Sequence, residues 1–335
     1  MRPSFQPLLI NGPFDDPGLF VSLAYRRRAL LFDLGDLGKL APGDLIKTTH
    51  VFVSHTHMDH FIGFDQLLRL LLGRTRRLRL FGPPGFLKQV TAKLQAYTWN
   101  LVRNYDQGLE ITATEVHAAQ RLTQTFDCQQ GFKPTEPKII YSAASTIHRE
   151  PAFQADMAIL DHQIPSLAFA LKERFHINIL TEPLKAMGLA TGPWASRFKE
   201  LLFSRADPET IVEVPRLNPQ KRPARLTLNE LTARAARITP GQKIAYVADA
   251  IGNQANEEKI VSLVQDADHL FIEAAFLDCH RELAKAKHHL TARQAGYIAR
   301  KARVRKMTIF HFSPRYTNQG HLLEQEARKE FSGQS

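Results

Sequence analysis

Four side chains of metal-binding types lie within six residues of one another. They are His55, His57, Asp59 and His60, in the string His-Thr-His-Met-Asp-His that follows an apolar run. Residues two apart in an extended chain point to the same side, so His55 and His57 can hold one ion. The turn that follows presents Asp59 and His60, which can hold a second. Imidazole and carboxylate ligands suit Zn²⁺, and paired metals can hold both the attacking and the leaving oxygen of a hydrolytic displacement.

Three later residues of metal-binding types each close an expected strand. These are His162, Asp249 and His311. Taken singly, a His at a strand end is usually capped or solvated, and an Asp there is usually a turn residue. His162 lies between two apolar strands, unlike His117, His148 and His176.

The elements that must position these residues follow from apolar periodicity. Strands are predicted at residues 19–25, 29–33, 50–54, 78–81, 157–160, 166–171, 243–248, 270–273 and 307–310. Helices are predicted at residues 64–72, from about 84 to 97, 255–265 and 291–302. Strands thus dominate first and then alternate with helices, which fits two packed sheets covered by helices.

The chain of 335 residues is predicted to form a single domain over residues 1–335. Residues 117–150 are polar and contain Gly and Pro, so they are interpreted as an insertion outside the core. Residues 179–218 contain several Gly and Pro residues and are interpreted as an arm-like segment.

The net charge and the two cysteines limit the kinds of partner, disulfide and metal site that the sequence allows. The formal net charge is +11 and the pI is about 9.7, which favours a polyanionic partner such as nucleic acid, although basic side chains also occupy ordinary solvated faces. The two cysteines, Cys128 and Cys279, form no C-x-x-C pair, which argues against a disulfide framework and a thiolate zinc site. Without an apolar leader or a run of about 18 apolar residues, a cytoplasmic protein without membrane spans is expected.

The H-x-H-x-D-H string resembles the signature of the metallo-β-lactamase superfamily. That resemblance implies an α/β fold, the αββα sandwich of two mixed sheets flanked by helices. Within the superfamily the chain looks like the ribonuclease Z branch, the tRNA 3′-processing endonucleases. The segments that carry this likeness are Phe271-Ile272-Glu273-Ala274-Ala275-Phe276, His289-Leu290-Thr291-Ala292-Arg293-Gln294-Ala295 and His311-Phe312-Ser313-Pro314-Arg315-Tyr316.

The resemblance implies two Zn²⁺ ions per chain, with Mn²⁺ or Mg²⁺ as alternatives. The superfamily's site also has a distant His, a bridging Asp and a last His at strand ends, and His162, Asp249 and His311 occur in that order, with His117, His148 and His176 as competing third ligands. The resemblance places one metal on His55, His57 and His162. The other is placed on Asp59, His60 and His311, with Asp249 bridging. Asp59 is implied to position the attacking water or to take its proton.

Glu273 and His289 are the implied catalytic pair. A Glu that orients a His and raises its proton affinity lets that His donate to a leaving oxygen or stabilise charge on phosphorus. The alignment with the family motif selects His289 over His288. Alternatively, both residues of the pair simply belong to an exposed helix start.

Substrate contacts are implied for Arg315 and for Gly192 and Pro193, which resemble a Gly-Pro element of the family's tRNA-gripping arm. Precursor tRNA would be the partner, and a homodimer is expected from the family. The function predicted is therefore removal of 3′ trailers from precursor tRNA.

The N-terminal turns depart from the family pattern. The chain has Asn11-Gly12-Pro13 where a Gly-Thr-Gly turn is usual, and Asp33-Leu34-Gly35-Asp36 where a Cys-Gly-Glu-Gly turn is usual. These departures favour the alternative function, hydrolysis of a small phosphodiester, thioester or sulfate ester. A third class, a nucleic-acid-binding protein that has lost catalysis, is disfavoured by the complete ligand set.

Overall fold

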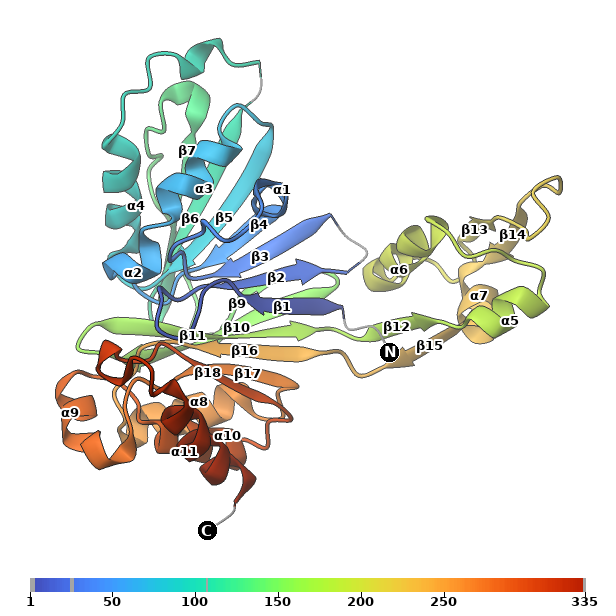
Figure 1. Ribbon diagram of the computed structural model, residues 1–335. Coiled ribbons are helices and arrows are strands. Elements are labelled where there is room, and N and C mark those ends of the chain that lie inside the picture. Colours follow the sequence, from blue (N-terminus) through green and yellow to red (C-terminus); the bar gives the residue numbers. More distant parts are fainter. Residues whose placement is uncertain (1–3, 25–26, 107, 334–335) are drawn as a thin grey trace.

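The computed structural model describes residues 4–24, 27–106 and 108–333. Two large β-sheets face each other (Figure 1). The first has eight strands in sequence order, antiparallel at both ends and parallel from β3 to β6. Its strands are β1 (Phe5–Leu9), β2 (Leu19–Leu23), β3 (Arg28–Phe32), β4 (Thr48–Phe52), β5 (Arg76–Gly82), β6 (Leu109–Val116), β7 (Gln120–Asp127) and β8 (Lys138–Tyr141).

The second sheet has six strands in the order β18-β17-β16-β11-β10-β9. β16, β17 and β18 are parallel, and the remaining pairs are antiparallel. The strands are β9 (Thr146–Arg149), β10 (Phe153–Asp161), β11 (Pro165–Glu173), β16 (Lys243–Val247), β17 (His269–Glu273) and β18 (Met307–Phe310).

Side-chain alternation along the strands divides the core into layers. In β3, Leu30 and Phe32 pack between the two sheets, whereas Ala29 and Leu31 face the helices. In β16, Tyr246 lies between the sheets, and its neighbours Ala245 and Val247 face the other helical layer.

Helices cover the outer face of each sheet (Figure 1). The first sheet carries α1 (Pro42–Leu45), α2 (Met58–Phe61), α3 (Phe64–Leu71) and α4 (Phe86–Gln95). The second carries α8 (Gln254–Val264), α9 (Arg281–Ala286), α10 (Ala292–Lys301) and α11 (Gly320–Ser332). Short 3₁₀ turns occur at Val102–Asn104, Cys128–Gln130, Asp278–His280 and Pro314–Tyr316. The predicted αββα architecture is confirmed.

Each predicted strand and helix corresponds to an observed element, with ends that differ by a few residues. The strand predicted at residues 19–25 is β2, and Tyr25 lies outside the described residues. The segment 117–150 differs from the expectation of an excursion outside the core. It contributes β7, β8 and β9, and Phe126, Cys128 and Phe132 are fully buried against α3 and α4.

A projecting unit, residues 176–239, extends from the end of the second sheet (Figure 1). Its base is an antiparallel pair, β12 (His176–Ile179) with β15 (Ala236–Thr239). Beyond them come α5 (Thr181–Ala186), α6 (Trp194–Ser204), the hairpin β13 (Ile211–Val214) with β14 (Ala224–Thr227), and α7 (Leu228–Ala235). Its apolar residues join the core between the sheets, so it is packed onto the body at its base. Residues 179–218, interpreted above as arm-like, lie inside this unit.

A polar cluster also joins the two sheets, at the end opposite to the turn that follows β4. Glu150, after β9, accepts two hydrogen bonds from Arg28 of β3, at 2.7 and 2.8 Å. His50 of β4 lies 3.5 Å from the same carboxylate, and the His148 ring lies 4.4 Å from the His50 ring.

Among the described residues, no helix is long and apolar enough to cross a membrane.

Candidate metal centre

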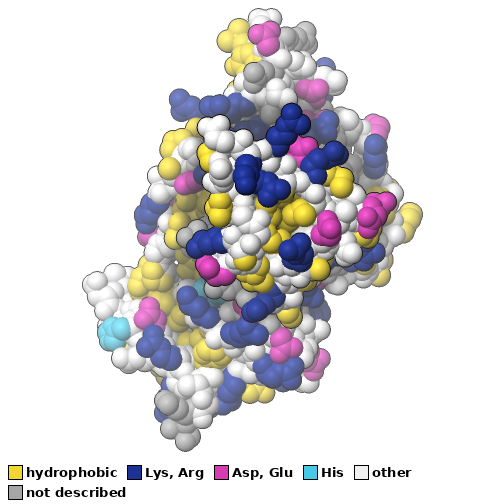
Figure 2. All heavy atoms as spheres, turned by 90° about the vertical axis from the view of Figure 1, so that its right-hand side faces the viewer, with side chains coloured by type: hydrophobic (Ala, Val, Ile, Leu, Met, Phe, Trp, Pro, Cys, Tyr) yellow, Lys and Arg dark blue, Asp and Glu magenta, His cyan; other side chains and the backbone are white. Residues whose placement is uncertain are grey.

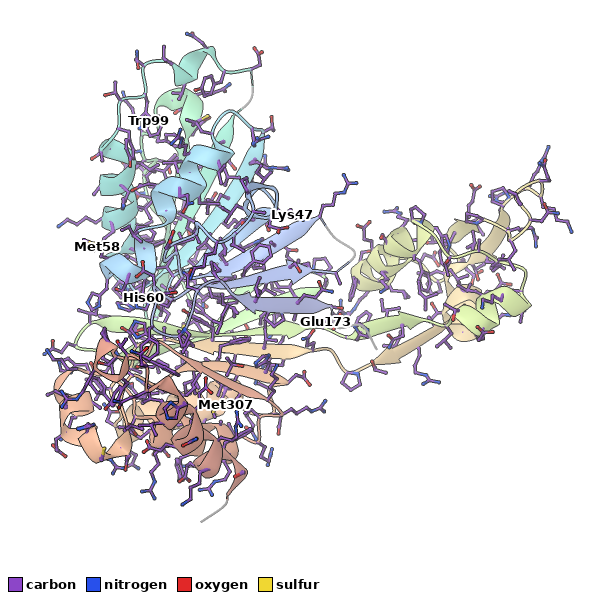
Figure 3. The ribbon with its side chains drawn as sticks, in the orientation of Figure 1. Lys47, Met58, His60, Trp99, Glu173 and Met307 are labelled. Carbon is purple, nitrogen blue, oxygen red and sulfur yellow. The ribbon has the colours of Figure 1, made fainter. Side chains whose placement is uncertain are left out.

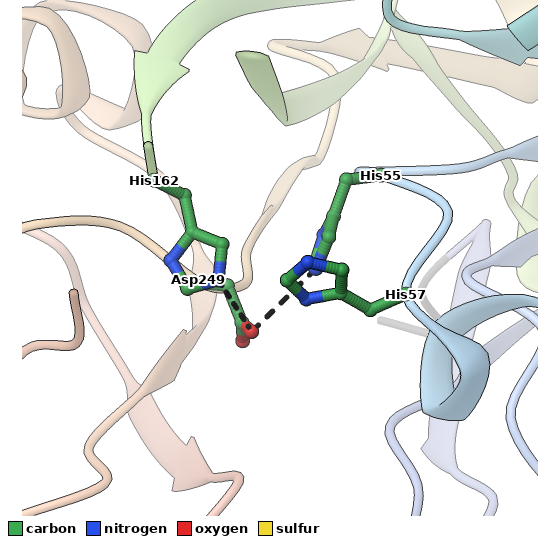
Figure 4. A group of neighbouring side chains, drawn as sticks. All are labelled: His55, His57, His162 and Asp249. Atoms are coloured by element: carbon green, nitrogen blue, oxygen red, sulfur yellow. Dashed lines mark ion pairs between the residues drawn. The ribbon is translucent and has the colours of Figure 1, made fainter. Parts of the chain in front are cut away.

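The ends of strands from both sheets meet at one edge and bring the predicted ligands together. His55 and His57 follow β4, and His162 follows β10 directly. The ring centroids of these three histidines lie 4.4–5.3 Å apart. Figure 4 shows the three rings around the carboxylate of Asp249, which follows β16. His60, at the end of the same turn, lies at this end of the sheets, whereas Glu173 marks the end where the projecting unit begins (Figure 3).

Asp249 lies between two groups of candidate ligands. Its Oδ2 is 3.4–3.7 Å from the Nε2 atoms of His55, His60 and His162. Its Oδ1 is 3.2 Å from Nδ1 of His311. The carboxylate can therefore contact a cation on either side.

Asp59, His60 and His311 form the second group. His311 Nε2 and His60 Nε2 lie 3.2 and 3.4 Å from Asp59 Oδ2. His311 follows β18 with a left-handed backbone, φ 62°, which turns the chain sharply as it leaves the sheet.

The protonation states suit ligation in most positions. Burial, followed by the charge of His60, lowers the pKa of His55 to about 2, so its imidazole is neutral at pH 7. Burial favours the neutral form of Asp59, but the hydrogen bond from His311 and the charge of His60 lower its pKa to about 2. Burial opposes charge on His60 as well, yet Asp249 and Asp33 raise its pKa well above the usual value.

Unpaired buried atoms test whether a metal fits. Within the described part of the chain, four buried atoms of this centre make no hydrogen bond: Nε2 of His55, Nε2 of His60, Nδ1 of His311 and Oδ1 of Asp249. Leaving such atoms without a partner is unfavourable in a protein interior. These four residues are spread over overlapping groups of candidate ligands, and within each group the ligand atoms lie within 4.8 Å of one another, so cations held by these groups would satisfy them. The donor set fits a metal centre.

Asp33 contacts His60 on the side opposite to the candidate ligand atom Nε2, and the sequence analysis missed this role. It is fully buried after β3, and its Oδ2 lies 2.9 Å from Nδ1 of His60. The Tyr246 hydroxyl donates to the same oxygen at 2.9 Å, and the Ser54 N–H and Oγ donate to the carboxylate as well. A carboxylate that holds the far nitrogen of a metal-binding His fixes its tautomer and orientation.

Glu273 and His289 form the predicted pair. Glu273, at the end of β17, is fully buried, and its Oε2 lies 3.0 Å from Nδ1 of His289. Its Oε1 accepts the N–H groups of Ala250 and Leu290, which fixes the carboxylate. Burial opposes a charge on His289, but Glu273 outweighs it and raises the pKa of His289 to about 9. His288 instead offers its carbonyl oxygen to Nδ1 of His162, at 2.8 Å.

The competing histidines lie elsewhere. His117 contacts Glu115, His148 contacts Glu150, and His176 lies between Glu173 and Asn178. Of the candidate substrate contacts, Gly192 and Pro193 precede α6 in the projecting unit, remote from the metal centre. Arg315 is exposed on the turn that follows His311.

An open cavity of about 360 Å³ lies against the centre and is lined in part by Asp59, His289 and His311. A group placed there would meet the candidate metal ligands and the Glu273–His289 pair together.

The sequence is similar to proteins named ribonuclease Z. It is 28% identical to the one from Deinococcus radiodurans over 294 residues, which are 86% of this chain and 83% of the relative. It is 30% identical to the one from Thermobifida fusca over 270 residues, which are 80% of this chain and 68% of the relative. No protein-family model matches the sequence.

The fold is similar to solved metallo-β-lactamase structures. The metallo-β-lactamase fold protein YhfI from Bacillus subtilis matches with a TM-score of 0.54 and 15% identity, covering 98% of this chain and 94% of that one. Human tRNase Z, short form, matches with a TM-score of 0.51 and 17% identity, covering 94% and 93%. At such identities these likenesses concern the fold.

Proposed function

Because the chain belongs to the ribonuclease Z family, we propose that it is a metal-dependent endoribonuclease that removes 3′ trailers from precursor tRNA. The observation that carries the proposal is the convergence of seven candidate metal ligands and the Glu273–His289 pair at one edge of the sheets, beside an open cavity that Asp59, His289 and His311 help to line. A degenerate site would be expected to lose at least one of these residues.

Two Zn²⁺ ions are the proposed cofactors. His55, His57 and His162 would hold one ion, and Asp59, His60 and His311 the other. Asp249 would lie between them, because its Oδ2 is close to ligands of both groups and its Oδ1 is close to His311 of the second. Bound metals would activate a water molecule and stabilise negative charge on the phosphoryl oxygens. Mn²⁺ and Mg²⁺ remain the alternatives.

The remaining chemistry belongs to side chains. The Asp59 side chain is 41% exposed, so its carboxylate can reach a water molecule in the cavity and orient it or take its proton. Nδ1 of His289 is engaged by Glu273, so the proton available for transfer is on Nε2. With a pKa near 9, His289 carries that proton at neutral pH and can deliver it to the leaving oxygen as the P–O bond breaks.

The projecting unit is the proposed RNA contact outside the centre. It contains ten Lys and Arg residues against six Asp and Glu. Figure 2 views the molecule from this side and shows Lys and Arg side chains spread over the face, with fewer acidic ones. Such a surface favours binding of a polyanion.

A homodimer is also proposed, from the resemblance alone, and light scattering would test it.

The deciding experiment is cleavage of an end-labelled precursor tRNA that carries a 3′ trailer, by zinc-loaded protein and by a His57→Ala variant. We expect a single metal-dependent cut near the 3′ end of the mature tRNA, absent in the variant. If the tRNA stays whole while a chromogenic phosphodiester is hydrolysed, the metal centre stands and the RNA substrate is wrong.

A further inference from the structure

An aromatic side chain from the N-terminal turn lines the cavity at the metal centre. Phe14 lies in the connection between β1 and β2, and it shares the cavity with Asp59, His289 and His311, which come from other parts of the chain. Phe14 is half-buried, so part of its ring is open to solvent. The proposed metal chemistry makes no use of it.

Several contacts hold this turn in place. Pro13 O accepts a hydrogen bond from the Phe312 N–H at 2.7 Å, and the rings of Phe14 and Phe312 pack edge to face with centroids 5.3 Å apart. Asn11 closes the turn by donating to Asp16 O at 2.9 Å and to Asp36 O at 2.8 Å. Phe14 is therefore positioned before any substrate arrives, directly beside the loop that carries His311.

The cavity admits only a small part of an RNA. A volume of about 360 Å³ is in the lower range for sites that enclose a small molecule, so a nucleotide next to the cleaved bond can enter, whereas a helix cannot. Such a nucleotide offers an uncharged, flat base and a charged phosphate. An aromatic side chain is a platform on which any base can stack.

Charge around the cavity separates these two parts. Asp16 lies on the same turn as Phe14 and disfavours a phosphate there, whereas the charge of Asp15 is paired with Lys39 at 2.8 Å. Lys287, exposed on the segment that leads to His289, also lines the cavity and attracts a phosphate. The base is thus directed towards Phe14 and the phosphate towards Lys287.

We propose that Phe14 stacks on the base of a nucleotide that directly flanks the scissile phosphate and so positions that phosphate at the metal centre. This inference rests on the proposed function, because it requires an RNA substrate. It assigns a positioning role to a turn whose sequence departs from the family pattern.

The test pairs variants of Phe14 with precursor tRNAs that lack one base, either 5′ or 3′ of the cleaved phosphate. Phe14→Ala should lower kcat/KM for the intact tRNA about 10-fold, within the range for loss of one base–aromatic stack. Removing the stacked base should lower kcat/KM of the wild type by a similar factor. Phe14→Ala should then reduce cleavage of that abasic tRNA no further.

Direct stacking gives a second readout, independent of cleavage. With metal chelated, 2-aminopurine at the contacted position should lose fluorescence on binding to the wild type and to Phe14→Tyr, but not to Phe14→Leu. Phe14→Leu keeps an apolar side chain against Phe312, so it separates stacking from packing of the turn. Phe331→Ala is the matched control, because Phe331 is also half-buried and packs against the same apolar cluster.

The inference would be overturned if Phe14→Ala lowered kcat/KM for both abasic tRNAs by the same factor as for the intact tRNA. Equal fluorescence changes with the wild type and with Phe14→Leu would overturn it as well. Failure of the proposed function is distinguishable from either outcome, since the wild type would then cleave no precursor tRNA at all.

Discussion

Asp33 shows how a residue outside the ligand set can decide how well the centre holds metal. Its carboxylate is hydrogen-bonded to Ser54, His60 and Tyr246, which belong to segments of two different sheets. It does so with a left-handed backbone, φ 56°, which is uncommon for a residue other than glycine. The local strain is compatible with a position fixed by the surrounding hydrogen bonds.

Replacing Asp33 should weaken metal binding without removing a ligand. For Asp33→Asn we expect zinc affinity to fall about 10- to 100-fold, the usual effect of losing a carboxylate behind a metal-binding His. Competition with a fluorescent zinc chelator measures the affinity, after urea unfolding has shown that the variant is folded. Tyr246→Phe removes only one donor to the same carboxylate and should have a smaller effect. Unchanged zinc affinity in Asp33→Asn would contradict the assigned role.

At the scale of residues, the sequence was informative where spacing is local. His55, His57, Asp59 and His60 are recognisable because one strand and one turn hold all four. Asp33 was not recognised as functional, because in the sequence it is an ordinary turn residue. Its role arises only when β3, β4 and β16 are brought together, and one sequence contains no signal for that meeting. Phe14 was missed for the same reason.

At the scale of elements, the turn after β3 is fitted closely under α3. A methyl group added at Gly63, which precedes α3, would lie 2.2 Å from the carbonyl oxygen of Gly35 and 2.8 Å from Cγ of Leu37. The backbone at Gly63 is in the ordinary helical region, φ −71°, so the demand for glycine is one of space.

Gly63→Ala should therefore destabilise the protein. We expect the free energy of unfolding to fall by about 1–3 kcal/mol, as for other overpacked positions. Gly43→Ala is the control, because a methyl group there meets nothing within 4 Å, and alanine in a helix is more stable than glycine by about 0.5–1 kcal/mol. Urea denaturation followed by tryptophan fluorescence measures both. Equal midpoints for the two variants would show that the turn can shift to make room.

The cross-sheet cluster at Glu150 gives a pH-dependent contribution to stability. Burial favours the neutral acid, but hydrogen bonds from His148 and Arg28 lower the pKa of Glu150 far below its usual value. A depressed carboxyl pKa stabilises the fold above the pKa of the unfolded chain, and this stabilisation is lost as the pH falls towards the folded value.

Glu150→Gln should thus lower the free energy of unfolding at pH 7 by about 2 kcal/mol, in the range for hydrogen bonds to charged groups. The difference between variant and wild type should shrink as the pH is lowered from 5 to 3.5. Urea midpoints across this range check the prediction. A difference that grows in acid would mean that the carboxylate does not carry the effect.

The elements themselves were largely predictable, since apolar runs and helical periodicity mark the strands that end at the centre and the helices α3, α4, α8 and α10, whereas α9 and α11 were not predicted. β7, by contrast, has a mostly polar sequence, and Phe126 is its only fully buried residue. Half-exposed strands of this kind lack the apolar run that identifies a strand. That is why residues 117–150 were interpreted as an excursion, although they extend both sheets.

At the scale of the whole molecule, cationic residues gather far from the metal centre. The tip of the projecting unit, between β13 and β14, carries exposed Lys221 and Arg222. An RNA that reaches both the tip and the cavity would contact the protein along its length.

Charge removal at the tip should weaken tRNA recognition and spare the chemistry. For Lys221→Ala with Arg222→Ala we expect a higher KM for precursor tRNA. The slope of log affinity against log salt concentration should also become smaller by about one for each phosphate contact that is lost. Hydrolysis of a chromogenic phosphodiester should stay unchanged. Arg328→Ala with Lys329→Ala, two exposed cations on α11, is the matched control. A tip variant with the salt dependence of the wild type would exclude the tip from RNA contact.

The hydrogen bond between Phe312 N–H and Pro13 O joins two segments that lie about 300 residues apart in the chain, so the second is synthesised long after the first. The candidate ligands are likewise spread from His55 to His311, so a nascent chain that has emerged only as far as β16 still lacks Asp249 and His311. The last His and the wall formed by Phe14 and Phe312 come together only after β18 has left the ribosome. A nuclease assembled in this order has no complete centre with which to cleave the RNA of the translating machinery until β18 has been synthesised.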